Sequence, residues 1–148
     1  MISLRDVLPV AGDITAKRVH DNPMFREETM SPGTMSLFDL GYIDVDRFIR
    51  ASERGAFYVS RLKQSHNPAI VRVFAGKGDR VQARGMGVYD AMAAGYLQTQ
   101  KRVIDVDVLL GHHGKTAVAR VVVIEDDDHR HHWYLTNVPR EVLSAENV

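Results

Sequence analysis

The chain has 148 residues, of which 45% are hydrophobic and 26% are charged, enough for one domain with a buried core. Nineteen basic and nineteen acidic side chains cancel, so a nucleic acid or membrane partner would have to be recognised by a local patch. The absence of cysteine excludes disulfides, iron–sulfur clusters and cysteine-ligated zinc. With no signal-peptide pattern and no apolar stretch of roughly 20 residues, we expect a cytoplasmic protein without a membrane partner.

The first predicted elements are a short helix and a buried strand. Asn22 and Pro23 are typical of a helix start, and they predict a helix over 24–30. The apolar run 35–40 predicts a strand that contains Asp39 near its end and breaks at Gly41. An acid at the carboxyl end of a strand is where open α/β sheets keep their chemistry, but an aspartate can also cap the next helix. Asp39 therefore has two candidate roles.

A second helix and strand follow at once. Asp44 can cap a helix that places Val45, Phe48 and Ile49 on one face and ends at Gly55. The aromatic and β-branched segment 56–63 then predicts a strand. This strand–helix–strand spacing favours a right-handed parallel crossover and therefore an α/β core.

After Lys63 the pattern changes to one of antiparallel strands separated by turns. The segment 85–100 is ambiguous, with a weak helix over 89–97. Ser144 is a candidate N-cap for a helix that begins at the end of the sequence. The strands are predicted over 69–74, 101–110, 116–124 and 132–136.

Several of these segments together resemble the DDE transposases of bacterial insertion sequences, in the group named for insertion sequence four. The resemblance extends over most of the chain from about His20 onward, and the order and spacing of the motifs make it specific. It rests on Phe38-Asp39-Leu40-Gly41-Tyr42-Ile43-Asp44, on Phe48, Gly55 and Phe57, on Ser60-Arg61-Leu62-Lys63, and on Trp133-Tyr134-Leu135-Thr136-Asn137-Val138-Pro139.

The resemblance implies an α/β fold: a partial ribonuclease-H-like core (strand–helix–strand) with an inserted antiparallel β-rich subdomain. The implied boundaries are 1–63 for the core, 64–143 for the insertion and 144–148 for the start of a truncated core helix. Members of the family join DNA ends by in-line phosphoryl transfer with two divalent metals, Mg²⁺ or Mn²⁺, which prefer oxygen ligands. The implied partner is DNA, at the terminal repeats of an insertion sequence, and homo-oligomerisation is left open.

By resemblance, Asp39 matches the second acid of the catalytic triad and is both a catalytic residue and a metal ligand. The family's third acid lies in a tyrosine–arginine–glutamate–lysine pattern, which does not occur in these 148 residues. Asp6, Asp13 and Asp21 do not match the first acid. Since one carboxylate cannot hold two metals, we expect a transposase fragment that is inactive alone and binds Mg²⁺ or Mn²⁺ weakly.

Four basic residues are candidate DNA contacts. Arg61 and Lys63 alternate beside the expected site, and Arg72 and Arg84 lie in the insertion, where family members contact their terminal repeats. The alternatives are a charged strand edge for the first pair and a solvated loop for the second. The corresponding alternative function is a catalytically dead DNA-binding module.

Histidines gather at two predicted hairpin tips, one at 112–113 and one at 129–132, beside the acidic run 125–128. Converging histidines and carboxylates can bind zinc, but residues of this kind are also common in polar turns, which is the interpretation we prefer. If these clusters worked with Asp39, a small metal-dependent hydrolase would be a third function.

Overall fold

The computed structural model describes residues 2–3, 31–38 and 44–148. The helix predicted over 24–30 and the candidate acid Asp39 lie outside the described residues. Within the described residues, no helix has the length and apolar character needed to span a membrane.

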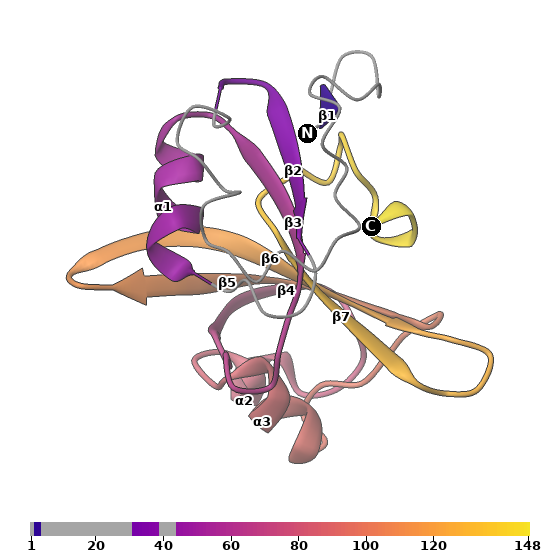
Figure 1. Ribbon diagram of the computed structural model, residues 1–148. Coiled ribbons are helices and arrows are strands. Elements are labelled where there is room, and N and C mark those ends of the chain that lie inside the picture. The colour runs from indigo at the N-terminus through magenta and orange to yellow at the C-terminus, as the bar shows by residue number, and fades with distance from the viewer. Residues whose placement is uncertain (1, 4–30, 39–43) are drawn as a thin grey trace.

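The described strands form one mixed sheet in the order β1-β2-β3-β7-β6-β5-β4 (Figure 1). The strands are β1 (Ile2–Ser3), β2 (Thr34–Phe38), β3 (Phe57–Arg61), β4 (Ala69–Ala75), β5 (Val103–His112), β6 (Lys115–Glu125) and β7 (His131–Thr136). The helices are α1 (Val45–Glu53), α2 (Arg80–Ala83), α3 (Val88–Ala93) and the 3₁₀ turn η3 (Ala145–Asn147).

The β2–α1–β3 unit has the parallel arrangement that the sequence predicts. Strands β2 and β3 pair in parallel, with Phe38 opposite Ser60. Helix α1 begins after Asp44, whose carboxylate accepts a hydrogen bond from the backbone N–H of Arg47 at 3.3 Å. Gly55 follows the helix with a φ of 69°, a conformation that glycine adopts at little cost. The predicted cap and stop are therefore confirmed.

The remaining strands are antiparallel and continue the same sheet. Strand β7 pairs with β3, so the segment expected to be an insertion is hydrogen-bonded edge to edge with the β2–α1–β3 unit. The β5–β6 hairpin is long and turns at His113 and Gly114, whose φ angles of 48° and 79° are those of a two-residue type I′ turn. The chain thus places β4 and β2 on opposite sides of the antiparallel strands.

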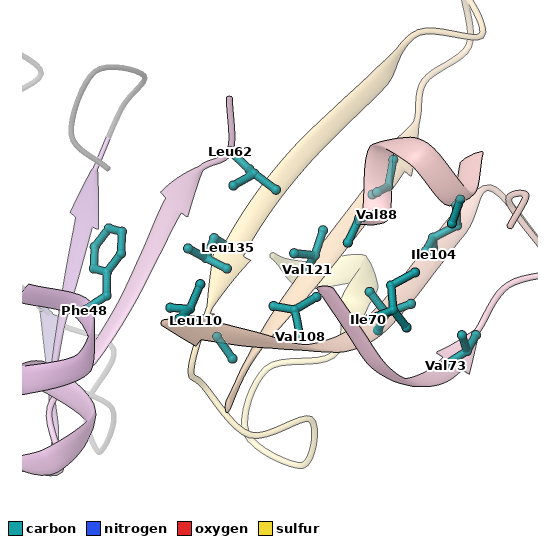
Figure 2. Packing of buried hydrophobic residues seen from close by; sticks show 14 of the residues in the cluster. Phe48, Leu62, Ile70, Val73, Val88, Ile104, Val108, Leu110, Val121 and Leu135 are labelled. Atoms are coloured by element: carbon teal, nitrogen blue, oxygen red, sulfur yellow. The ribbon is translucent and has the colours of Figure 1, made fainter. Parts of the chain in front are cut away.

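The core lies between one face of the sheet and the three α-helices. Phe48 of α1 and Val88 of α3 belong to the same buried cluster as the inward-facing residues of β5 and β6 (Figure 2). Alternate residues of β5 supply this face, among them Val108 and Leu110. The opposite face carries the other residues of β5, Asp105 and Asp107, and this alternation follows from the period of two along a strand.

Candidate functional site

The carboxyl ends of β2 and β3 lie at the same edge of the sheet, because the two strands are parallel. Asp39 follows Phe38, the last residue of β2, in the sequence, and its own position is outside the described residues. The N-cap of α1 is Asp44, so the capping role that could have explained Asp39 belongs to another residue. Asp44 therefore fills the cap of α1, and the role of Asp39 as an acid at the end of the strand stays a prediction.

Aromatic packing holds this edge against α1. The Phe48 ring stacks on Tyr58 of β3 with centroids 4.2 Å apart and meets Phe38 of β2 at 6.0 Å. Tyr58 is fully buried, and burial raises the pKa of its hydroxyl well above the ordinary value, which keeps the group neutral. One helix residue thus joins the two parallel strands.

The threonine–asparagine step after β7 fastens that strand to β3 and α1. The Asn137 amide accepts a hydrogen bond from Tyr58 N–H at 2.9 Å and donates to the Ala56 carbonyl at 2.9 Å and the Ser52 hydroxyl at 3.1 Å. The Thr136 hydroxyl donates to the Tyr58 carbonyl at 2.5 Å. Because the Asn137 side chain takes the place of a backbone partner, the chain can leave the sheet here.

A buried charge network holds the chain that leaves β7. Asp105 of β5 receives two hydrogen bonds from Arg120, at 3.2 and 2.8 Å, and two from Arg140, at 3.0 and 2.7 Å. Arg120 also donates to the carbonyls of Val138 and Leu143, at 2.8 and 2.9 Å. Arg120 and Asp105 are each 4% exposed, so this pair at the centre of the network is shielded from water. It fixes the segment that follows the threonine–asparagine step.

The four predicted DNA-contacting residues fall into two groups. Arg61 ends β3 and is half-buried, and Lys63 is exposed two residues later, so both lie near the β2–β3 edge. Arg72 lies on β4, four strand spacings from β3, a separation of about 19 Å. Arg84 is exposed just after α2, where the next residue bonds to β4. The structure therefore does not gather the four residues at one point.

Arg72 already has a partner within the chain. Its guanidinium lies 4.3 Å from the centroid of the Phe74 ring, and Arg140 lies 3.4 Å from the same centroid. Such cation–π contacts leave the N–H groups at the rim of the guanidinium accessible to a phosphate. Near Lys63, burial lowers the pKa of His66, and the charge of Lys63 lowers it further.

The acidic run and the second histidine cluster form the β6–β7 turn. Glu125 accepts hydrogen bonds from His129 at 2.8 Å and from Thr99 at 2.8 Å, and Asp126 accepts one from His132 at 2.8 Å. These bonds lower the pKa of Glu125 to about 2 from its ordinary 4.5, with His129 the largest cause. They also lower the pKa of Asp126 to about 2, with His132 the largest cause. The turn is thus held by hydrogen bonds among its own side chains and to Thr99.

We expect the hydrogen-bonded carboxylates of the β6–β7 turn to become protonated only in strong acid. Since both carboxyl pKa values are lower in the folded chain than in the unfolded one, their stabilisation is present above about pH 4.5 and disappears as the pH falls toward about 2. In an NMR titration, His129→Leu should raise the midpoint of Glu125 and leave that of Asp126 unchanged. Wild-type midpoints near 4 for both carboxyls would contradict this assignment.

Sequence reasoning missed two clusters that the fold brings together. The pairing of Asp105 with Arg120 could have been found, because both residues interrupt apolar strands that pair with each other. Asp46 meets His112 across the fold, with Oδ1 and Nδ1 2.8 Å apart, and no sequence signal joins residues so distant in the chain.

The described chain is a mixed α/β domain with two parallel strands. In the sequence an acid follows the first of these strands, and the second ends at Arg61 and is followed by Lys63. The family model described as "Transposase DDE domain" matches residues 1–148. The chain belongs to this family, as its motifs predicted.

A curated relative agrees with this assignment over a short stretch. The chain is 41% identical over 43 residues to a transposase for insertion sequence element IS231B from Bacillus thuringiensis subsp. berliner. This stretch is 29% of the chain and 9% of the relative, so the chain matches only a small part of that protein. No solved structure matches the chain.

Proposed function

We propose that this chain is part of a DNA transposase that acts by metal-dependent phosphoryl transfer, and that it contributes the second acid, Asp39. The observation that carries the proposal is the parallel pairing of β2 with β3, since it brings the ends of the strands before Asp39 and Lys63 to one edge. The family match over residues 1–148 supports it. On this proposal β2, α1 and β3 are a partial ribonuclease-H-like core, and residues 64–143 are the β-rich insertion.

The chemistry at this edge follows from the residue types. A carboxylate such as Asp39 suits Mg²⁺ or Mn²⁺, which would activate an attacking hydroxyl and offset charge on the leaving oxygen. Arg61 and Lys63 would bind phosphate oxygens and hold the DNA strand beside the acid. One carboxylate does not hold two metals about 3.5–4 Å apart, so we expect no DNA cleavage by this chain alone.

The β-rich part of the chain would bind DNA without chemistry. Arg72 on β4 lies about 19 Å across the sheet from Arg61 in strand spacings, a distance that spans several base pairs of duplex, and Arg84 follows α2 beside β4. DNA bound at both groups would cross the sheet from the β2–β3 edge to β4. Assembly into a homo-oligomer stays a prediction.

DNA binding should depend strongly on salt and on both basic pairs. The logarithm of the binding constant falls linearly with the logarithm of the salt concentration. Removal of one side chain that binds a phosphate makes this negative slope shallower by about 0.9 for duplex DNA. The double variant Arg61→Gln with Lys63→Gln should therefore make the slope shallower by about two. The double variant Arg72→Gln with Arg84→Gln should have the same effect. The measurement is fluorescence anisotropy with labelled insertion-sequence ends. The matched control is Lys101→Gln with Lys115→Gln, two exposed charges outside the predicted DNA-binding groups, which should change nothing.

Two results would contradict the proposal. One is an equal decrease of binding in the Lys101 and Lys115 control, which would mean that only total charge matters. The other is cleavage of the DNA by this chain with Mn²⁺, because a single acid should not support it. Binding that needs no divalent metal agrees with a chain that holds DNA without cutting it.

A further inference from the structure

The tip of the β5–β6 hairpin lies against the first turn of α1, and three metal-ligating side chains meet there. His112 is the last residue of β5, His113 is in the turn, and Asp46 is the second residue of α1. One ligand atom from each of the three lies within 4.8 Å of the other two. Asp46 Oδ1 and His112 Nδ1 are 2.8 Å apart, and the two imidazole rings meet edge to face with centroids 3.8 Å apart.

The hairpin gives these histidines a defined position. The β5–β6 pairing continues up to His112 opposite Lys115, so only His113 and Gly114 are outside the ladder. Helix α1 packs on β5 and β6, and its Phe48 and Ile49 are buried in the core. The cluster therefore joins two packed elements and is not carried by one free loop.

The spacing of the three ligand atoms is close to that of a zinc site. With zinc–ligand bonds of about 2.0–2.2 Å, two ligands of a tetrahedral ion lie roughly 3.4 Å apart. Rotation of these exposed or half-buried side chains can open the 2.8 Å contact and close the wider separations to this value. Two imidazoles and one carboxylate, with water as the fourth ligand, suit zinc and not the hard ions Mg²⁺ or Mn²⁺.

The second histidine cluster differs in its geometry. At the β6–β7 turn Glu125 pairs with His129 through one oxygen and with His131 through the other, at 2.8 and 3.5 Å, and His132 pairs with Asp126. Within the described part of the chain, the group at Asp46 alone brings three such ligand atoms together.

We propose that Asp46, His112 and His113 form a binding site for Zn²⁺ that links the β5–β6 hairpin to the start of α1. Zinc bound here cross-links residues 46 and 112 and stabilises the fold by mass action. This site is separate from the Mg²⁺ or Mn²⁺ chemistry of the proposed function and does not depend on it.

Calorimetric titration of the metal-free full chain with ZnCl₂ near pH 7.5 tests the site. We expect one zinc per chain, no competition from a large excess of Mg²⁺, and a Tm that rises with zinc. Asp46→Asn and His113→Asn should each weaken zinc binding at least about tenfold. Asparagine is favoured in a type I′ turn, so His113→Asn keeps the hairpin, and circular dichroism should confirm the fold.

The matched control is His129→Asn at the other hairpin tip, which should leave zinc binding unchanged. The proposal is overturned if wild-type chain takes up no zinc at about 0.1 mM. It is also overturned if Asp46→Asn and His113→Asn bind zinc as tightly as the wild type does, or if His129→Asn weakens zinc binding as much as they do.

Discussion

Asp105→Asn should lower the free energy of unfolding by about 3–5 kcal/mol, the largest effect that we expect from one substitution. The change keeps the shape of the side chain but removes the negative charge between Arg120 and Arg140. Arg120 is 4% exposed, so its guanidinium would remain buried without a counter-charge. Breaking a buried pair in this way costs far more than breaking a pair on the surface.

The neighbouring residue Asp107 provides a matched control. It lies two positions along the same strand and pairs with Arg140 at 3.0 Å, but its side chain is 21% exposed. We expect Asp107→Asn to cost about 1 kcal/mol or less. Urea unfolding followed by the fluorescence of Trp133 measures both variants. If both variants lost the same stability, the buried network around Asp105 would not be the interaction that fixes the end of β7.

Asn137→Ala should be the second most damaging change, at about 2–4 kcal/mol. It removes three hydrogen bonds and leaves the Tyr58 N–H and the Ala56 carbonyl without the partner that the amide supplies. Both residues are buried, so the two groups would not be compensated fully by water. Removal of the amide also releases the point at which the chain leaves β7.

Asn67 provides a control for Asn137, because it tests the loss of a side-chain amide at an exposed position. Its side chain also makes two bonds at 2.9 Å, accepting from Tyr89 N–H and donating to Asp90, but it is exposed. Asn67→Ala should therefore cost about 1 kcal/mol or less. Thermal unfolding of the two variants under the same conditions makes the comparison. A destabilisation at Asn67 as large as that at Asn137 would contradict the role of the Asn137 amide as partner of buried backbone groups.

Local patterns predicted most elements, because most of them are bounded by cap or turn residues that can be recognised in the sequence. Asp44 and Gly55 define α1 by a cap and a left-handed residue, and alternation predicted β5 and β6 nearly to their ends. The turn between these strands is shorter than predicted, because β5 continues through His112 and β6 begins at Lys115. Helix α2 was not predicted, since its one turn is held by the Asp79 cap without an apolar period.

For the candidate site, only the features formed by residues close together in the sequence could be predicted. The motif around Asp39 and the strand ending at Arg61 are short segments, and their parallel pairing followed from the spacing between them. The Asp105–Arg120 network and the Asp46–His112 pair depend on which strands and helices meet. Such pairings across the fold leave no periodic signal in one sequence.

Manganese-induced broadening of backbone amide NMR signals, compared between the wild type and Asp39→Asn, tests most directly whether Asp39 is a metal-binding acid at the sheet edge. A carboxylate there should bind Mn²⁺ weakly and broaden Phe38 and Arg61, which end the two parallel strands. The substitution should remove that broadening and leave any broadening at the acidic turn 125–128 in place. Broadening at Phe38 and Arg61 that persists in Asp39→Asn, or that is absent from the wild type, would contradict the role of Asp39.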